Sequence, residues 1–392
     1  MKRRTQTSLR RRLNAAILVF ALILTLVPFS GSAAGAKNAV NTSARAHVLL
    51  EATSGRVMSE HNSSEKLPMA STTKIMTCLL ACERGNMDDV VTVGAESVGL
   101  DGTSIYLRQG ETITLRELCY GLMLCSGNDA AMAIAVHLGG SQEGFAKLMN
   151  ERARQIGAYN TNFVTPNGLP AEGHYTTAMD LALIAAQAMQ NELFKEIVGT
   201  SSMTLEADED SPVRYLKSKN KILYNYEGGN GVKTGYTKAA GKCLVAGASR
   251  DGMQLIAVVL NDYSMFPDCM SLLDYGFENY KWTDVTGQTL LHDALTVENG
   301  LKYATDAVIM DEIYLPLNEN DSKIKINYRL QNGVNAPISR GDVVGSAQYS
   351  LNGEVLREVP IYAAEDVGEN TYRYWLERVL TDWLGAGRKA WE

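Results

Sequence analysis

The sequence predicts an α/β protein of the α+β kind, in which helices flank an antiparallel sheet. Two strand-forming segments lie far apart along the chain, at residues 46–60 and 242–260, and a block of apolar helices separates them. Such early and late strands can pair in one sheet that the intervening helices cover. Beyond Trp282 the pattern changes to alternating apolar and polar residues, which predicts a small all-β domain followed by a C-terminal amphipathic helix.

These changes of pattern also set the expected domain limits. The chain has 392 residues, of which 45% are hydrophobic and 21% charged, so it is long enough and apolar enough for two folded domains. We expect a first, larger domain over residues 37–285 and the small β domain over residues 286–367. The amphipathic helix is expected over residues 368–392.

Residues 1–36 have the organisation of a secretory signal. Six basic residues precede an apolar run over residues 13–29, and Ala34-Gly-Ala36 offers a cleavage site. The apolar run approaches spanning length, so an uncleaved anchor stays open as an alternative. Removing residues 1–36 takes away six positive charges and no acids, which changes the net charge from -7 to -13. We therefore expect an exported, acidic protein without the clustered Lys and Arg that nucleic acid binding needs.

The six cysteines of this exported chain could form disulfides, but their positions favour buried free thiols. Cys78 and Cys82 are one turn apart on a single apolar helix, where a disulfide would constrain little. Cys119, Cys125 and Cys243 lie in apolar runs, where a thiol acts as a small hydrophobic group. No group of Cys and His has the spacing of metal ligands, so we expect neither a metal site nor a cofactor.

The first domain is expected to begin with a hairpin over residues 46–60 that turns at Ser54-Gly55. An apolar helix follows Pro68, which is suited to the start of a helix. Further helices are expected over residues 115–125, 130–138 and 142–156, and to about residue 189 with Thr176 or Thr177 as the N-cap. Two strands, over residues 242–249 and 253–260, complete the sheet.

The last helix has an apolar face, which is formed by Tyr372, Trp375, Leu376, Val379, Leu380, Trp383 and Leu384. Charged residues such as Arg373 and Glu377 lie opposite. Two interpretations remain open at this point. The helix could dock on its own β domain, or it could lie in the plane of a membrane interface, for which tryptophan is well suited.

Ser71 and Lys74 are a candidate nucleophile and base at the start of the helix after Pro68. Their i, i+3 spacing places both side chains on one helical face. A hydroxyl is a weak nucleophile, and an amine held beside it can take its proton. The spacing alone is weak support, because it recurs at Ser63/Lys66 and Ser218/Lys221, both in polar, turn-like surroundings. An ordinary helix cap with a solvated lysine is the alternative.

Two further motifs contain polar residues in an apolar setting. Ser126 and Asn128 lie in a break between two apolar helices, where side chains can project from a rigid scaffold into a cleft. Lys233-Thr234-Gly235 occupies an expected strand edge. The lysine and the hydroxyl can bind a carboxylate, and the glycine lets a substrate backbone approach closely.

The order Ser71-x-x-Lys74, Ser126-x-Asn128, Lys233-Thr-Gly235 resembles that of the penicillin-binding proteins and serine β-lactamases. The surrounding sequence is similar to that of the low-molecular-mass D-alanyl-D-alanine carboxypeptidases. The segments that carry this closer resemblance are Met69–Thr77, Ser126–Ala130, Thr165–Leu169, His174–Thr177 and Gly231–Thr237. The resemblance implies a β-lactamase/transpeptidase-like catalytic domain, and it favours a membrane role for the C-terminal helix.

The resemblance also implies roles for the site residues. Ser71 would attack the carbonyl between two terminal D-alanines, with Lys74 as base and Ser126 as proton relay. Asn128 would bind the substrate amide and hold Lys74, and Gly235 would let the substrate approach. Lys233 and Thr234 would receive the terminal carboxylate. The backbone N–H groups of Ser71 and Tyr236 would form the oxyanion hole.

The expected partners are peptidoglycan stem peptides that end in D-Ala-D-Ala, β-lactam antibiotics and a membrane surface. The expected location is the outer face of the cytoplasmic membrane or the cell wall. Three alternatives remain open: a serine β-lactamase, a non-enzymatic penicilloyl-binding sensor and a wall-binding module. Glu172 is the nearest candidate for the deacylating base of a β-lactamase. His174 is either a support for the site or a helix-start residue satisfied by backbone.

Overall fold

The computed structural model describes residues 40–206, 212–287 and 290–389, and the chain divides into two compact units between Tyr280 and Lys281. The expected signal over residues 1–36 lies outside the described residues. The expected domain limit after residue 285 is a few residues later than this division. Strand β10 (Lys281–Asp284) pairs with β13 (Tyr314–Leu317), and these hydrogen bonds place residues 281–284 in the second unit.

A five-stranded antiparallel sheet is the centre of the first unit, in the order β2-β1-β9-β8-β7. Its strands are β1 (Ala46–Glu51), β2 (Val57–His61), β7 (Gly229–Thr237), β8 (Gly241–Arg250) and β9 (Met253–Leu260). The early and late strands meet where β1 pairs with β9, with Val48 opposite Val258. This pairing confirms the predicted antiparallel sheet, and it leaves β7 as an edge strand.

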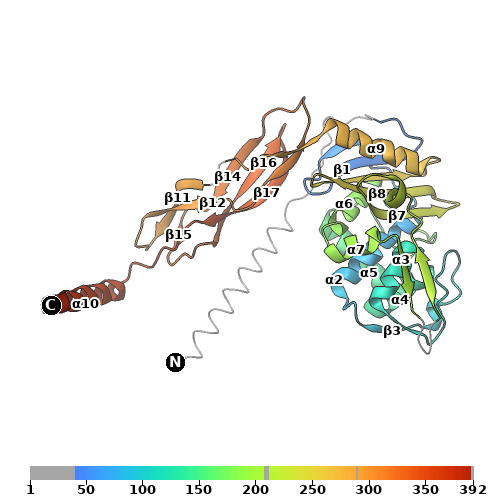
Figure 1. Cartoon of the computed structure of the whole chain (residues 1–392), viewed down its shortest axis with the longest axis horizontal. Helices are drawn as coiled ribbons and strands as arrows, with labels where there is room; N and C mark the ends of the chain where they lie inside the picture. The colour runs from blue at the N-terminus through green and yellow to red at the C-terminus, as the bar shows by residue number, and fades with distance from the viewer. Residues whose placement is uncertain (1–39, 207–211, 288–289, 390–392) are drawn as a thin grey trace. The chain divides into compact units, whose positions relative to one another are not determined.

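Helices cover both faces of this sheet. Helix α9 (Met265–Asn279) lies on one face and α6 (Ala178–Ala188) lies on the other, together with most of the helical block (Figure 1). The remaining helices are α2 (Lys74–Arg84), α3 (Leu115–Leu124), α4 (Asn128–Gly139), α5 (Gln142–Ile156), α7 (Glu192–Gly199) and α8 (Ile222–Asn225), with 3-10 turns η1 (Ala70–Thr73) and η2 (Ala95–Ser97). Two ribbons complete the unit, β3 (Val90–Thr92) with β4 (Thr112–Thr114) and β5 (Ser202–Leu205) with β6 (Arg214–Lys217).

Helix α2 is buried from Lys74 to Ala81, which explains why this part of its sequence is mostly apolar. All six cysteines are free thiols, four of them fully buried, as the sequence predicts. Helix α6 begins where expected, because the Thr177 hydroxyl accepts a hydrogen bond from the Asp180 backbone N–H. The Thr177 contact therefore fixes the first turn of α6.

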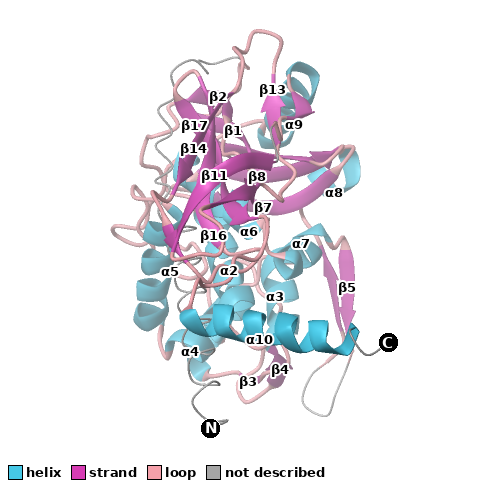
Figure 2. Cartoon of the chain, turned by 90° about the vertical axis from the view of Figure 1, so that its left-hand side faces the viewer, coloured by secondary structure: helices cyan, strands magenta, loops and turns pink. Residues whose placement is uncertain are grey.

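The second unit is built on a six-stranded sheet in the order β14-β16-β17-β12-β11-β15. Its strands are β11 (Leu290–Glu298), β12 (Ala304–Val308), β14 (Lys325–Leu330), β15 (Val334–Asn335), β16 (Val343–Leu351) and β17 (Glu354–Ala363). Buried aliphatic residues and Tyr349 form a separate core, which confirms the predicted all-β domain. The chain continues into α10 (Tyr372–Lys389), a single uninterrupted helix (Figure 2). Within the described residues, no helix has both the length and the apolar character needed to cross a membrane.

Candidate active site

Ser71 and Lys74 lie at the junction of η1 and α2. The sequence predicts both residues in the first turn of one helix, but that turn is a 3-10 turn and the α-helix begins at Lys74. Ser71 is partly exposed, whereas Lys74 is fully buried. The junction therefore presents one hydroxyl to solvent, with an amine directly behind it.

The backbone next to Ser71 is strained. Ala70 has a φ of 49°, a left-handed conformation that is unfavourable for a residue with a Cβ atom. Its carbonyl accepts a hydrogen bond from the Thr73 hydroxyl at 2.8 Å. Gly168 packs against the same carbonyl, so closely that a Cβ atom at position 168 would lie 1.9 Å from the oxygen. The loop that contains Gly168 thus helps to fix the conformation that exposes Ser71.

The Lys74 amine has three hydrogen-bond partners. Its Nζ lies 2.9 Å from Ser71 Oγ, 2.7 Å from Asn128 Oδ1 and 2.7 Å from the carbonyl oxygen of Asn167. Burial, together with the positive charge of Lys233, holds the pKa of Lys74 well below its usual range. The site can therefore hold a neutral amine beside the serine hydroxyl, as a general base requires.

Ser126 lies in the predicted break between α3 and α4, but α4 begins at Asn128, two residues earlier than the sequence predicts. Ser126 has a φ of 64°, which turns the chain sharply between the two helices. Asn128 is the first residue of α4 and is 3% exposed. Its amide nitrogen donates to the Asp101 carbonyl at 2.5 Å, so its oxygen faces Lys74. The structure thus brings Asn128 into contact with Lys74. Ser126 precedes Asn128 by two positions in the sequence.

Lys233, Thr234 and Gly235 lie on the edge strand β7. Lys233 is 2% exposed, and burial together with the charge of Lys219 lowers its pKa to about 7. A Cβ atom at position 235 would lie 3.1 Å from the backbone nitrogen of Ser71. Strand β7 therefore packs directly against η1, and only glycine fits at the contact without a shift.

The other predicted residues lie outside this cluster of contacts. The Tyr236 side chain is 65% exposed, so its backbone N–H is the group that can serve the site. Glu172 is exposed on the loop before His174 and makes no described contact with Lys74. Asp129 accepts hydrogen bonds from the backbone N–H groups of Ile105 and Leu107, and it thereby holds the segment that passes over Asn128.

Sequence reasoning missed two parts of the site. The first is the Asn167 carbonyl, because every residue has a carbonyl and the residue type gives no signal. The second is the contact between His174 and Thr73, whose side chains lie 2.9 Å apart although the residues are 101 positions apart in the chain. The sequence offered His174 as a possible support for the site and the turn-rich Thr165–Leu169 segment as a loop beside it, but neither pattern identified Thr73 as the partner of the ring.

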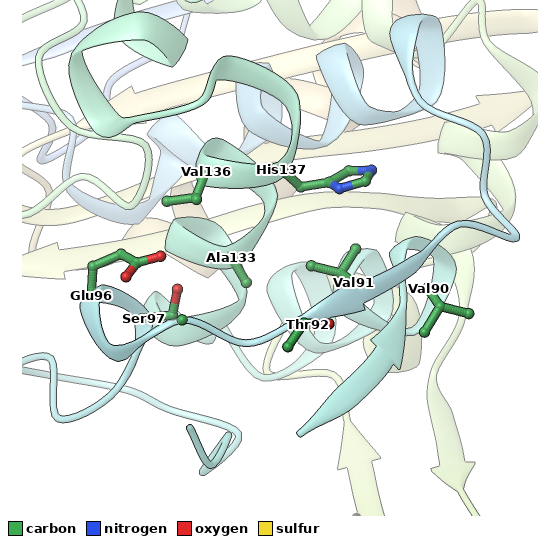
Figure 3. A pocket seen from close by; sticks show the side chains of 9 residues that line it. Val90, Val91, Thr92, Glu96, Ser97, Ala133, Val136 and His137 are labelled. Atoms are coloured by element: carbon green, nitrogen blue, oxygen red, sulfur yellow. The ribbon is translucent and has the colours of Figure 1, made fainter. Parts of the chain in front are cut away.

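A separate hollow of about 100 Å³ lies between β3, η2 and the C-terminal half of α4 (Figure 3). Its lining residues are Val90, Val91, Thr92, Gly94, Glu96, Ser97, Ala133, Val136 and His137. None of the residues of the three motifs lines it, and it is smaller than a ligand pocket of roughly 300 Å³ or more. The Ser71 junction, which lies at the surface beside an edge strand, is the better candidate for chemistry.

Two family models match this chain, one over most of each unit. The family described as D-alanyl-D-alanine carboxypeptidase matches residues 33–264, and the C-terminal domain of penicillin-binding protein 5 matches residues 286–369. The D-alanyl-D-alanine carboxypeptidase DacF of Bacillus subtilis is 32% identical, over 95% of this chain and 99% of that relative. DacC of Escherichia coli is 31% identical, over 91% of this chain and 92% of that relative.

Solved structures show the same fold. Penicillin-binding protein 5 from Haemophilus influenzae is 27% identical, has a TM-score of 0.67, and matches 84% of this chain and 99% of its own. A penicillin-binding protein from Streptococcus pneumoniae has a TM-score of 0.71 at 22% identity, which supports the fold alone. The matches over nearly the full length of both sequences, and the Ser71, Asn128 and Lys233 geometry that accompanies them, place this chain in the D-alanyl-D-alanine carboxypeptidase family of low-molecular-mass penicillin-binding proteins.

Proposed function

We propose that this protein is a serine D-Ala-D-Ala carboxypeptidase that removes the terminal D-alanine from peptidoglycan stem peptides. The observation that carries the proposal is the 2.9 Å contact between Lys74 Nζ and Ser71 Oγ in a site that lowers the pKa of Lys74. An amine that is neutral for part of the time can take the serine proton as the hydroxyl attacks. Membership of the carboxypeptidase family supports the choice of substrate.

The partners of Lys74 explain why its lone pair would face the serine. A neutral amine has two N–H groups and one lone pair. Asn128 Oδ1 and the Asn167 carbonyl can only accept, so they use the two N–H groups. The remaining lone pair then accepts the hydrogen bond from Ser71 Oγ–H. Two fixed acceptors thus orient the base before substrate arrives, which is the preorganisation that general-base catalysis needs.

The reaction would proceed through an ester on Ser71. Ser71 Oγ attacks the carbonyl carbon of the penultimate D-alanine while its proton passes to Lys74, and the backbone N–H groups of Ser71 and Tyr236 stabilise the oxyanion. The C–N bond then breaks, and Ser126 relays the proton to the amine of the departing D-alanine. Water hydrolyses the ester and frees Ser71.

Lys233 and Thr234 would select substrates with a free C-terminus. The buried Lys233 is close to half-protonated at neutral pH, and an incoming carboxylate would favour its charged form. The Thr234 hydroxyl would add a second hydrogen bond to the same carboxylate. β-Lactam antibiotics present a carboxylate and a reactive carbonyl together, so they would acylate Ser71 by the same route.

The activity test uses the mature protein and a peptide that ends in Lys-D-Ala-D-Ala. The wild type should release D-alanine and Ser71→Ala should not, while Ser63→Ala serves as the matched control outside the site. Equal release by wild type and Ser71→Ala would contradict the proposal. Incubation with penicillin separates the related activity, because a long-lived adduct on Ser71 supports the carboxypeptidase and rapid turnover would indicate a β-lactamase.

We also propose that the protein is exported and that α10 binds a membrane surface. The apolar side chains of this helix are exposed, with Val379 at 62% and Trp383 at 74%. An amphipathic helix with exposed tryptophan is suited to the interface between head groups and acyl chains. The charged residues of the helix include Arg373 and Glu377, which form an i, i+4 pair on the opposite face.

Vesicle binding tests this placement. The mature protein should sediment with phospholipid vesicles, and deletion of residues 368–392 should abolish sedimentation. Val379→Glu, on the apolar face, should weaken binding strongly. Thr381→Glu adds the same charge on the polar face and should leave binding nearly unchanged. Equal binding by the deletion variant would exclude α10 as the anchor.

A further inference from the structure

A second path of hydrogen bonds leads to Lys74 through His174. The His174 ring is buried between η1 and the loop over residues 164–169. On one side its Nε2 lies 2.9 Å from Thr73 Oγ1, and Thr73 is the residue before Lys74. On the other side its Nδ1 accepts a hydrogen bond from the backbone N–H of Val164 at 3.0 Å. The imidazole therefore connects the start of α2 to the loop.

The partners of the ring assign its tautomer. A backbone N–H can only donate, so Nδ1 has no proton and the single ring proton is on Nε2. That proton is donated to Thr73 Oγ1, whose own hydroxyl proton is donated to the Ala70 carbonyl at 2.8 Å. Burial lowers the pKa of His174 to about 4, so the ring is neutral at the pH of a working enzyme. The backbone N–H of Thr165 also points at Nδ1, at 3.4 Å, so both donors that face this nitrogen come from the loop.

The loop on the far side of the ring supplies the Asn167 carbonyl. This carbonyl accepts from Lys74 Nζ at 2.7 Å, and the neighbouring Pro166 carbonyl accepts from Thr77 Oγ1 at 2.6 Å. The loop is therefore bound to α2 at two positions one turn apart, Lys74 and Thr77. A shift of the loop by a few tenths of an ångström would lengthen the bond that orients the Lys74 amine.

We propose that His174 is a positioning residue that fastens the 164–169 loop to Thr73, and so holds the Asn167 carbonyl where it turns the Lys74 lone pair towards Ser71. The inference rests on the proposed role of Lys74 as the base. His174 touches neither substrate nor the reacting atoms. It acts through two bonds, one to the loop and one to Thr73, and both are needed.

Two substitutions separate the two bonds. His174→Asn places an amide oxygen near the Nδ1 position and keeps an acceptor for Val164, but it loses the donor to Thr73. His174→Gln can place an amide nitrogen near the Nε2 position, which keeps the donor and loses the acceptor. We expect each to lower the rate constant of acylation by a fluorescent penicillin about tenfold, the effect of one hydrogen bond. The dissociation constant of the initial penicillin complex should not change.

A double-mutant cycle tests the connection to Thr73. Thr73→Val removes the hydroxyl and with it the bonds to His174 and to the Ala70 carbonyl, so adding His174→Asn should reduce acylation no further than Thr73→Val alone. Thr72→Val removes a similar hydroxyl on the same 3-10 turn, one that donates to the Met69 carbonyl, and its effect should multiply with that of His174→Asn. Independent effects of His174 and Thr73, or a loss confined to the dissociation constant, would overturn the proposal.

One measurement needs only the wild-type protein, so it does not require that any variant folds. Nitrogen-15 NMR of labelled histidine should show His174 with a protonated Nε2 and a bare Nδ1 at pH 7. A protonated Nδ1, or a charged ring at that pH, would contradict the assignment. A failure of the proposed carboxypeptidase activity would give a different result, because the wild type itself would then not be acylated at Ser71.

Discussion

The Ser71/Lys74 pair and its look-alike Ser63/Lys66 share one spacing, yet they lie in opposite environments. Lys74 is fully buried and bonded to Ser71, whereas Lys66 is exposed and lies 4.8 Å from the ring of Tyr175. The Ser63 hydroxyl donates to Glu60 Oε2, a carboxylate, whereas the Ser71 hydroxyl lies beside an amine. The spacing provides only proximity. Burial and two fixed acceptors distinguish Lys74, the proposed base, from Lys66.

The third pair, Ser218/Lys221, supports the same conclusion. Ser218 is buried, but Lys221 is exposed and lies 5.6 Å from the ring of Phe266. No apolar helix surrounds the Lys221 amine, which is therefore not desolvated as the Lys74 amine is. The comparison teaches that the apolar helix behind Ser71, which buries the amine, is as much part of the catalytic motif as the two polar residues.

Removing each lysine in turn should give the largest difference between these regions. Lys74→Met should lower the rate constant of acylation by penicillin about a thousandfold, because the serine loses its general base. Lys66→Met and Lys221→Met should stay within about twofold of the wild type. A comparable loss of acylation in Lys66→Met would contradict the conclusion that burial distinguishes Lys74 from the look-alike lysines.

The contact between β7 and η1 distinguishes the Ser71 region further, and Gly235→Ala tests it. The new Cβ atom would lie 3.1 Å from the Ser71 backbone nitrogen, so strand and turn must move apart. Acylation should fall about thirtyfold, because oxyanion donors act only when well placed. Gly199→Ala is the matched control, since its Cβ atom would meet only the Asn230 carbonyl at 3.8 Å. Unchanged acylation in Gly235→Ala would show that the close contact has no role.

The polar residues of the site were predictable from sequence because their types are unusual in apolar surroundings. A lysine in an apolar helix, a serine and an asparagine between two such helices, and a Lys-Thr-Gly strand each contrast with their neighbours. The central sheet was predictable for another reason, because β1 and β9 are almost wholly apolar. The class of the fold, the pairing of early and late strands and the second β domain followed from periodicity.

The groups that orient the site were not predictable. The Asn167 carbonyl is a main-chain group, and its position depends on how a loop folds against α2. The left-handed conformation of Ala70 has no signal in the residue type, since alanine normally avoids it. The His174 ring meets Thr73 only after the chain has folded. Residue types indicate which chemistry is present, and packing determines how it is aimed.

The pH dependence of substrate binding tests whether burial also matters for Lys233. Its pKa of about 7 means that the free enzyme loses this positive charge as the pH rises through neutrality. The KM for a peptide with a free terminal carboxylate should therefore rise about tenfold between pH 6 and pH 9, the effect of losing one charge-assisted hydrogen bond. Lys233→Arg stays charged throughout this range, so its KM should be nearly constant. A flat profile for the wild type would mean that Lys233 keeps its charge despite burial.

The smallest change, in stability only, is expected at Lys66 of the look-alike pair Ser63/Lys66. Lys66→Ala removes the contact with the Tyr175 ring and a positive charge near Asp180, whose pKa is raised chiefly by burial and lowered in part by Lys66. An exposed cation–π contact contributes about 0.5–1 kcal/mol, so the free energy of unfolding should fall by that amount or less. Acylation of Ser71 should not change. Urea unfolding at pH 7 measures the free energy of unfolding, and penicillin binding measures acylation. A loss of acylation without a loss of stability would mean that Lys66 affects the site through Tyr175, the residue after His174.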